Sequence, residues 1–330
     1  MSQASTASPI FIVGRPRSGT TLISTLISAH PSIAISPESH FLRYWMRSYA
    51  SQGIEGLKGF NHFWSEFSQS ADFSHFGISP DQIKHQILSG SDFSSKAIFN
   101  TLLTAYAHKL SKHRWGEKTP EHYRDIETLL KWYPQAQIIW MLRDPRGQIA
   151  SLRVVPWAEP YEDLHATSWK NSISAMEHWA SDRRVQIVKY EALVTDPEKT
   201  LQAVCNFLGE EYAPEMLNRS NETSPMINFS GWEEKHLQDT LKPINVKSIS
   251  KWKSTLSPMA ISIIEHVARP EMVRCDYEPV TETLNSWHSL KWFLMKGGRK
   301  LKRSITFAYA RRDPYAFVDK SYHPYHEQAL

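Results

Sequence analysis

Short apolar runs alternate with amphipathic stretches along most of the chain. Four runs have the length and composition of buried strands, and they span residues 10–13, 33–35, 137–142 and 185–188. Longer stretches favour helices, and they span residues 95–112, 163–180, 197–208 and 258–267. This alternation predicts an α/β fold in which a central parallel sheet is flanked by helices.

The first apolar run leads into a turn rich in glycine and arginine and then into a helix. The spacing from Gly14 to Gly19 is that of a Walker A loop, in which backbone N–H groups and the helix dipole hold a phosphate. Thr20 stands where that loop has its lysine, and Arg17 supplies a positive charge inside the turn. We therefore expect a P-loop-like cradle for a phosphate-like anion, suited to something other than hydrolysis of magnesium-bound ATP.

Two later segments bring polar residues to the ends of predicted elements. Lys118 precedes a helix that we expect to start near Pro120, with Thr119 as its cap, and it would lie at the edge of the sheet. The third apolar run leads directly into Arg143 and a further helix. Residues 52–95 show no clear period, and we expect them to form helices and loops that cover the site.

Bulk composition limits the class of protein. The chain has 330 residues, 41% of them apolar, which is enough for one large α/β domain or two small ones, and its formal charge of +4 indicates no nucleic-acid partner. We assign residues 1–285 to one α/β domain and residues 286–330 to a basic, aromatic C-terminal extension. The extension is a solvated surface helix, a contact for a partner protein or a peripheral contact for a membrane surface.

No targeting or membrane signal is recognisable in the sequence. Residues 1–8 lack the basic and apolar parts of a signal peptide, and no run reaches about 18 apolar residues, so no membrane span is expected. Cys205 and Cys275 are the two cysteines, and they predict free, buried thiols in a reducing compartment. A cytoplasmic protein is the location we expect.

Two motifs, each after a predicted buried strand, resemble the sulfotransferase family that uses 3′-phosphoadenosine-5′-phosphosulfate (PAPS). Pro16-Arg-Ser-Gly-Thr-Thr21 is similar to the family's 5′-phosphosulfate loop. Arg143-Asp-Pro-Arg, with Ser151 eight residues after Arg143, is similar to its 3′-phosphate site. The resemblance covers residues 9–252, favours the tyrosylprotein and glycan branches, and implies PAPS as co-substrate without a metal.

The resemblance assigns the two charged ends of the donor to different residues. Arg143 and Ser151 would bind the 3′-phosphate, as a charged fork and a hydroxyl donor, while the first loop binds the 5′ end. Tyr190, just past the last predicted strand, would touch the nucleotide or else belong to the core. The implied donor-binding residues are Arg17, Ser18, Gly19, Thr20, Thr21, Arg143, Ser151, Tyr190 and Lys251.

The resemblance also implies three catalytic residues: Glu38, Lys118 and Ser250. Glu38 would be the general base that takes the proton of the acceptor hydroxyl, or else it caps the following helix. Lys118 would stabilise charge on the transferring group and the leaving oxygen together with Arg17. Glu117 is then either the orienting partner of Lys118 or an exposed acid. Ser250 would aid sulfuryl transfer.

The residues after Glu38 differ from the tyrosylprotein branch. Ser39-His40 stands where that branch has Thr-Arg, which puts a peptide acceptor in doubt and makes His40 a second candidate base. We expect the acceptor to be a hydroxyl of a small molecule, a glycan or a lipid. Trp45 and Trp64 suit stacking on a sugar or a lipid, or else belong to the core.

Two other functions compete with a PAPS-dependent sulfotransferase. A P-loop kinase or NTPase needs a Walker lysine, which is absent, and an acidic magnesium ligand, for which Asp144 is a weak candidate. A non-catalytic module that binds a nucleotide or a glycan needs neither Glu38 nor Lys118, yet the chain has both. The sulfotransferase is therefore the function that the sequence favours.

Overall fold

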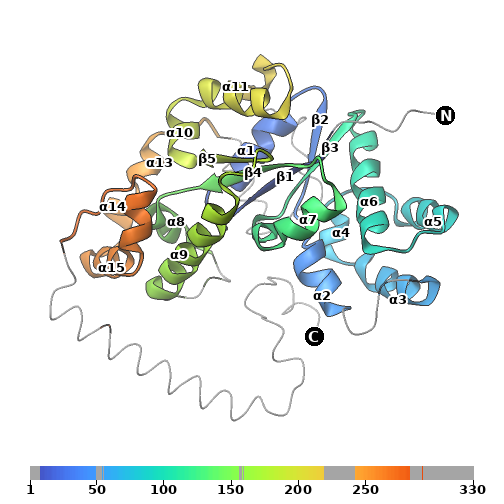
Figure 1. Ribbon diagram of the computed structural model, residues 1–330, viewed down its shortest axis with the longest axis horizontal. Coiled ribbons are helices and arrows are strands. Elements are labelled where there is room, and N and C mark those ends of the chain that lie inside the picture. The colour runs from blue at the N-terminus through green and yellow to red at the C-terminus, as the bar shows by residue number, and fades with distance from the viewer. Residues whose placement is uncertain are drawn as a thin grey trace, which may run out of the picture. The chain divides into compact units, whose positions relative to one another are not determined.

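The computed structural model describes residues 8–49, 54, 56–155, 158, 160–218, 242–282 and 292. A five-stranded sheet in the order β2-β3-β1-β4-β5 forms its centre, and all neighbouring strands are parallel (Figure 1). The strands are β1 (Ile10–Gly14), β2 (Ile33–Ser36), β3 (Arg114–Lys118), β4 (Gln137–Leu142) and β5 (Val185–Lys189). The predicted fold class is confirmed, and each strand expected from an apolar run is present.

Helices connect these strands. Those before β3 are α1 (Thr20–Ser28), the π-helix η1 (Phe41–Trp45), α2 (Met46–Ser48), α3 (Leu57–Phe67), α4 (Ala71–Ser74), α5 (Pro80–Gly90) and α6 (Ser95–Lys109). Those between β3 and β5 are the 3₁₀-helix η2 (Pro120–Asp125), α7 (Ile126–Trp132), α8 (Pro145–Leu152) and α9 (Glu162–Trp179). Those after β5 are α10 (Tyr190–Thr195), α11 (Pro197–Leu208), the 3₁₀-helix η3 (Pro214–Leu217), α13 (Lys247–Ser250), α14 (Trp252–Thr255) and α15 (Pro258–Arg274). Within the described residues, none of these helices has both the length and the apolar character needed to span a membrane.

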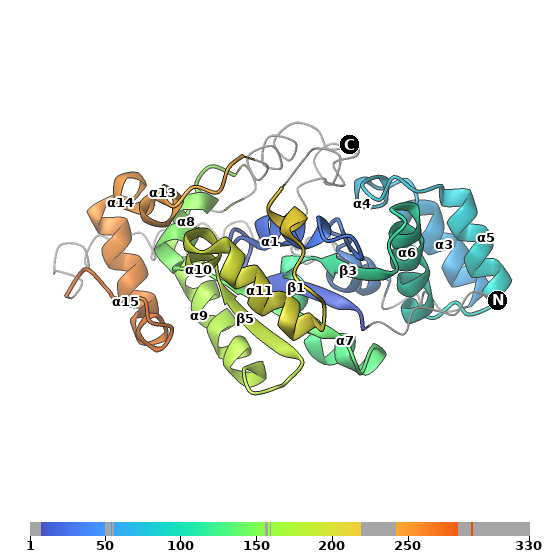
Figure 2. The ribbon, with the colours of Figure 1, turned by 90° about the horizontal axis from the view of Figure 1, so that it is seen from above.

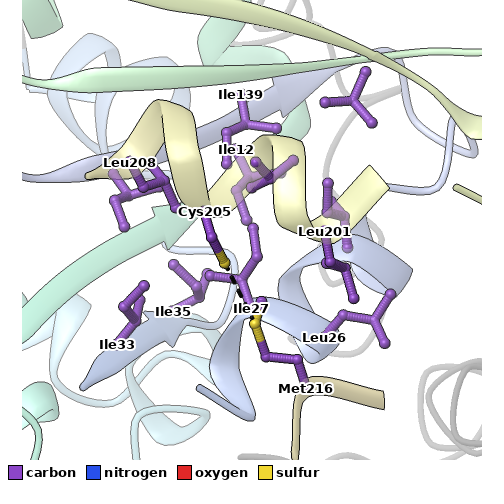
Figure 3. Close-up of a cluster of buried hydrophobic side chains, with 14 of the residues drawn as sticks. Ile12, Leu26, Ile27, Ile33, Ile35, Ile139, Leu201, Cys205, Leu208 and Met216 are labelled. Atoms are coloured by element: carbon purple, nitrogen blue, oxygen red, sulfur yellow. Dashed lines mark hydrogen bonds between the residues drawn. The ribbon is translucent and has the colours of Figure 1, made fainter. Parts of the chain in front are cut away.

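One face of the sheet packs against α1 and α11 through aliphatic side chains. Ile12 of β1 and Ile139 of β4 lie in one buried cluster with Ile27 of α1 and Leu201 of α11 (Figure 3). Side chains alternate between the two faces along a strand, so every second residue of β1 and β4 joins this cluster. Removal of these side chains from water is the main favourable contribution to the stability of the sheet.

Both cysteines are free and buried, as the sequence predicts. Cys205 of α11 lies in the aliphatic cluster, with its Sγ 3.6 Å from Met216 Sδ (Figure 3). Burial, together with the charge of Glu210, raises the pKa of the Cys205 thiol to about 11. Cys205 is therefore a neutral packing residue with little nucleophilic character.

The opposite face of the sheet is aromatic. Phe11 of β1 packs against Phe99 of α6 and against Tyr133, with ring centres 6.4 and 5.9 Å apart. Trp140 of β4 lies 5.3 Å from the ring of Tyr123 in η2. Figure 1 shows α11 and α7 on opposite sides of the sheet, so helices cover both faces as a parallel sheet requires.

Helices α3 to α6 gather on the side of the sheet where β2 and β3 lie (Figures 1 and 2). Their interior is built from aromatic rings, among them Phe63 and Phe67 of α3, whose centres are 5.1 Å apart. Trp45 at the end of η1 lies 5.1 Å from Phe67. Trp45 and Trp64 are 6% and 4% exposed, which confirms that both tryptophans are core residues.

The sequence analysis does not predict β3, which lies between β2 and β1. Four of its five residues are charged or glycine, so the segment lacks the apolar signal of a buried strand. The charged side chains of β3 can be buried because they have hydrogen-bond and ion-pair partners. Arg114 is 3% exposed and donates to the Leu208 carbonyl at 2.8 Å and to Glu210 at 2.7 Å. Lys118 is therefore the last residue of an internal strand.

The helix expected near Pro120 begins there as η2 and continues as α7. Thr119 precedes it, but its side chain makes no capping hydrogen bond, so the predicted cap is wrong. The Thr119 hydroxyl instead donates to Glu117 and accepts from the Ser39 N–H at 3.1 Å. It therefore connects the end of β3 to the segment that follows β2.

The chain divides into two compact units. One comprises Met1–Arg143 and Ala175–Val246, and the other comprises Asp144–Ser174 and Lys247–Leu330. The first unit contains the whole sheet, while the second contains α8 and the helices α13 to α15. The assignment of residues 1–285 to one domain and of 286–330 to an extension stays a prediction, since residue 292 alone of that extension is described.

Gly116 in β3 allows a close approach of β2 and β1. A Cβ at this position would lie 2.4 Å from Ile35 Cδ1 and 2.8 Å from the carbonyl oxygen of Ile10. We expect Gly116→Ala to lower the free energy of unfolding by about 1–3 kcal/mol, because the backbone of β1 cannot move away from the new methyl group without distorting the sheet. Urea unfolding of the full chain measures this change.

Gly90→Ala is the matched control for that variant. It lies at the end of α5, and no atom lies within 4 Å of a Cβ placed there. Its free energy of unfolding should stay within about 1 kcal/mol of the wild-type value. Equal unfolding midpoints for the two variants would contradict the packing described for β3.

Candidate active site

The pairing of the strands brings several predicted site residues to one edge of the sheet. Gly14 at the end of β1 lies opposite Met141 of β4, and Leu142 at the end of β4 lies opposite Lys189 of β5. The residues that follow these strands, Arg143 and Tyr190, therefore leave the sheet side by side. This is the carboxyl edge, where open α/β sheets bind their ligands.

The loop between β1 and α1 has the conformation of an anion cradle. The Ser18 N–H and hydroxyl both donate to the Arg15 carbonyl, at 3.1 and 2.7 Å, and close the turn. Arg17 has a φ of 69° and Gly19 a φ of 96°. The first hydrogen bond of α1 runs from Ile23 N–H to Gly19, so the preceding amides have no acceptor inside the helix. Such amides, with the helix dipole, suit an anion.

The two glycines of this loop are required by close contacts. A Cβ on Gly14 would lie 2.5 Å from the carbonyl oxygen of Met141, and one on Gly19 would lie 2.5 Å from the ring of Tyr190. The loop after β1 is therefore pressed against β4 and against the start of α10. Tyr190 is half-buried, packs on the aliphatic core and also lies at the loop, while its contact with a nucleotide stays a prediction.

Arg143 joins the two arginine-bearing loops. Its Nη1 donates to the carbonyl oxygen of Arg17 at 3.0 Å. Its guanidinium carbon lies 4.0 Å from the centre of the Tyr190 ring, within cation–π range. The residues of the two motifs thus meet at one place, although 126 positions separate them in the sequence.

A second arginine, Arg15, holds the cradle loop in place through an ion pair. It was not predicted from the sequence. Arg15 is 6% exposed, and its Nη1 lies 3.3 Å from Glu121 Oε1 in η2. Arg124 Nε lies 3.1 Å from the other oxygen of Glu121. The ion pair ties the loop after β1 to the segment directly after Lys118. The position of Arg15 directly before the loop motif was the available signal in the sequence, but its partner Glu121 could not be recognised from sequence spacing.

Glu38 and Lys118 form an ion pair at the carboxyl ends of β2 and β3. Ser36 lies opposite Glu117, so the following residues of the two strands are neighbours. Lys118 Nζ lies 2.5 Å from Glu38 Oε1, and the two side chains are 9% and 33% exposed. The residue before η1 is His40, so the alternative in which Glu38 caps that helix is wrong.

His40 is the second basic partner of Glu38. Its Nε2 lies 3.3 Å from Glu38 Oε2. Burial of Glu38 opposes ionisation, but Lys118 and His40 outweigh it and hold the pKa of the carboxyl well below its usual range. Glu38 is therefore a carboxylate at neutral pH, in the form that accepts a proton.

Glu117 corrects an expectation, because it is neither exposed nor a partner of Lys118. It is 0% exposed and accepts from the Ser39 hydroxyl at 2.8 Å, from the Thr119 hydroxyl and from His122 Nδ1 at 3.0 Å. Burial raises its pKa, but His122 and the hydroxyl donors outweigh burial and lower it. Glu117 holds the segment after β2 on β3 and so keeps Glu38 beside Lys118.

Three predicted residues belong to the second compact unit. Ser151 lies in α8, Ser250 ends α13 and Lys251 precedes α14, with Ser250 and Lys251 exposed. Trp252, the third residue of Ser-Lys-Trp, is buried and lies 4.2 Å from the Arg146 guanidinium. The roles of Ser151, Ser250 and Lys251 toward the donor stay predictions.

Asp144 has no free carboxylate oxygen for a metal. Arg146 Nε donates to Oδ1 at 3.0 Å and Arg146 Nη2 donates to Oδ2 at 2.7 Å. The same carboxylate accepts the Arg146 N–H at 2.8 Å and caps α8. Arg146 in turn pairs with Glu265 of α15 at 2.7 Å, so Asp144 belongs to a buried structural network.

Comparison with known proteins supports this arrangement. The model of the sulfotransferase family matches residues 9–214. Protein-tyrosine sulfotransferase 1 of Danio rerio is 25% identical over 82% of this chain and 72% of the relative. Protein-tyrosine sulfotransferase 2 of Gallus gallus is 23% identical over 84% of this chain and 72% of the relative.

A solved structure shows the same fold. The sulfotransferase domain from the olefin synthase of Synechococcus PCC 7002 superposes with a TM-score of 0.57, covering 82% of this chain and 97% of that domain at 23% identity. The family match begins at residue 9, just before β1, and includes the cradle loop, both arginine motifs, Glu38, Lys118 and Tyr190. From the match over more than half of its length, the chain belongs to the sulfotransferase family and is a sulfotransferase enzyme.

Proposed function

We propose that this enzyme transfers the sulfuryl group of PAPS to the hydroxyl of an acceptor. The observation that carries the proposal is the contact of Arg143 with the Arg17 carbonyl at 3.0 Å, because it brings the loop after β1 and the arginine after β4 together. A donor with a phosphosulfate on one side of its ribose and a phosphate on the other needs such a pair of elements. The loop after β1 would bind the 5′ end, and Arg143 would bind the 3′-phosphate.

The transfer needs one base and a set of positive groups. In the proposed step the acceptor oxygen forms a bond to sulfur, the bond from sulfur to the bridging oxygen breaks, and adenosine 3′,5′-bisphosphate leaves. Glu38 takes the proton of the acceptor hydroxyl. Lys118, Arg17 and the amides of the cradle loop stabilise the charge that develops on the leaving phosphate.

The ion pair with Lys118 determines how strong a base Glu38 is. A carboxylate held between Lys118 and His40 is ionised but only weakly basic, because both cations favour the charged form. An anionic group that approaches Lys118 competes for its charge. The pKa of Glu38 then rises toward its ordinary value, and the base becomes stronger when the donor is in place.

The acceptor is proposed as a hydroxyl of a protein or of a small molecule. Its class is suggested by the two protein-tyrosine sulfotransferases described above, whose names indicate a phenolic acceptor. The glycan or lipid acceptor expected from the sequence remains within this class of hydroxyl compounds. Transfer of labelled sulfate from PAPS to a panel of tyrosine peptides, phenols, glycans and lipid alcohols decides between them.

The competing kinase or NTPase function has little support in the structure. Asp144, the candidate magnesium ligand, has both carboxylate oxygens bonded to Arg146. A non-catalytic binding module would need no carboxylate beside Lys118, whereas Glu38 lies 2.5 Å from its Nζ. Sulfuryl transfer accounts for both features.

Arg143→Gln tests the proposed donor site. We expect it to raise the Kd for adenosine 3′,5′-bisphosphate by about 10- to 100-fold, the scale of lost hydrogen bonds to a charged group. Isothermal titration calorimetry measures this Kd. Arg184→Gln is the matched control, because Arg184 pairs with Asp182 at 2.6 Å just before β5, at the opposite edge of the sheet. Equal Kd values for both variants would show that Arg143 does not bind the nucleotide.

Glu38→Gln tests the proposed base. We expect kcat to fall by about 10²- to 10⁴-fold, because the amide accepts no proton, while the Kd for adenosine 3′,5′-bisphosphate changes little. Labelled-sulfate transfer measures kcat, and the exposed Glu127 of α7, replaced by Gln, is the control. Near wild-type kcat in Glu38→Gln would remove Glu38 from this role. Since its pKa is lowered, the wild-type rate should show no loss from protonation of Glu38 in the neutral range.

A further inference from the structure

Asp72 is a buried carboxylate that the proposed reaction does not use. It lies in the short helix α4, outside the sheet, and is 1% exposed. Its Oδ2 accepts from Trp45 Nε1 at 2.8 Å, and its Oδ1 lies 2.9 Å from His40 Nδ1. A charge this deeply buried is costly to the fold unless it is paired, so His40 and Trp45 are its stabilising partners.

His40 connects this carboxylate to Glu38. One ring nitrogen, Nδ1, faces Asp72, and the other, Nε2, lies 3.3 Å from Glu38 Oε2. The opposite oxygen of Glu38 contacts Lys118. Asp72, His40, Glu38 and Lys118 therefore form a continuous chain of alternating charge. An imidazole placed between two carboxylates satisfies both only when each nitrogen carries a hydrogen.

The surroundings of His40 favour this imidazolium. Burial disfavours the charge, but Asp72 and Glu38 outweigh it and raise the pKa of His40 well above its ordinary value. His75, at the end of α4, is the other histidine of this region, and burial lowers its pKa to about 4 despite Asp72. His75 is thus neutral at physiological pH and leaves the positive charge beside Asp72 to His40.

The backbone at His40 has an unusual conformation, of the kind that is often found at functional sites. His40 has a φ of 48°, a conformation that residues with a side chain seldom adopt. It is followed by the π-helix η1, and its carbonyl accepts from the N–H groups of Tyr44 and Trp45 at 2.9 and 3.4 Å. Asp72 contacts the residues at both ends of this turn, His40 and Trp45. Strain and π-turns are retained where the surrounding contacts impose them, often at functional sites.

We propose that His40 is a positioning residue for Glu38, and that Asp72 holds it as an imidazolium whose Nε2–H donates to Glu38 Oε2. This inference rests on the proposed role of Glu38 as the base. The bond fixes one carboxylate oxygen, so that the carboxylate keeps one orientation while Lys118 interacts with the donor. An imidazolium has no lone pair to accept a proton, so His40 is not itself the base.

The arrangement has a consequence for pH dependence. When pH rises through the raised pKa of His40, the ring loses one proton and keeps the other on Nδ1, toward buried Asp72. Nε2 then presents a lone pair to Glu38, and the positioning bond is lost. The rate should therefore fall at alkaline pH. Asp72 and Glu38 are the charged groups that raise the pKa of His40. The other titratable groups nearby are Lys118 at the end of β3 and the neutral His75 at the end of α4.

His40→Gln, His40→Arg and Asp72→Asn, studied in the full chain, test the inference. We expect His40→Gln to lower kcat by about 10-fold or more, the scale of one charged hydrogen bond, with an unchanged Kd for adenosine 3′,5′-bisphosphate. His40→Arg, a permanent cation, should recover most of kcat and lose the alkaline fall. His85→Gln, at an exposed position of α5, is the control and should behave as wild type.

A readout that does not need activity accompanies these rates. Histidine NMR titration of wild-type protein should show His40 with a pKa above its ordinary value, and Asp72→Asn should lower that pKa. Thermal unfolding and nucleotide binding show whether each variant folds, and if His40→Gln does not fold, the pH profile of His40→Arg decides.

Three results, each obtained beside an active wild type, would overturn this inference and leave the proposed function intact. They are an unchanged kcat and pH profile in His40→Gln, a His40 that titrates at or below its ordinary pKa, and an unchanged alkaline fall in His40→Arg. A wild-type chain that transfers label to no acceptor would instead overturn the proposed function, and the positioning role with it.

Discussion

The hydrogen bond from Arg143 to the Arg17 carbonyl holds together the two halves of the proposed donor site. It depends on the register of β1, β4 and β5, which ends the three strands at one level. It also depends on Gly19, since a side chain there would displace the Tyr190 ring on which the Arg143 guanidinium lies. The arrangement that suits the proposed donor, which has an anionic group at each end, thus follows from strand register, one glycine and one aromatic ring.

Three carboxylates near the ends of β2 and β3 show how partners decide the role of a charge. Glu117 is fully buried and accepts from two hydroxyl groups, one backbone amide and His122, so its role is structural. Asp72 is similarly buried, but its Oδ1 contacts His40 Nδ1 and favours the charged form of that ring. Glu38 alone of the three is partly exposed, at 33%, and forms an ion pair with Lys118. The exposed member is therefore the one suited to proton transfer.

Strands with a run of apolar residues could be predicted from the sequence. A strand with buried polar residues could not. The apolar runs at 10–13 and 137–142 form β1 and β4, because their side chains are stable only when they are buried in a core. β3 was missed because Arg114 and Glu117 look like surface residues, although Glu210 pairs with Arg114 and Ser39 and His122 donate to Glu117 in the fold. The cradle loop and Arg143 were found because their spacing is local. Asp72 and Arg15 were not found, since their partners, His40 and Glu121, come close only in the fold.

We propose that one nucleotide spans both arginine-bearing loops. A crystal structure of the protein with adenosine 3′,5′-bisphosphate would show where each phosphate lies. We expect the 5′-phosphate at the amides at the start of α1 and the 3′-phosphate within hydrogen-bond distance of the Arg143 guanidinium. A nucleotide bound with its 3′-phosphate away from Arg143, or bound at the opposite edge of the sheet, would contradict it.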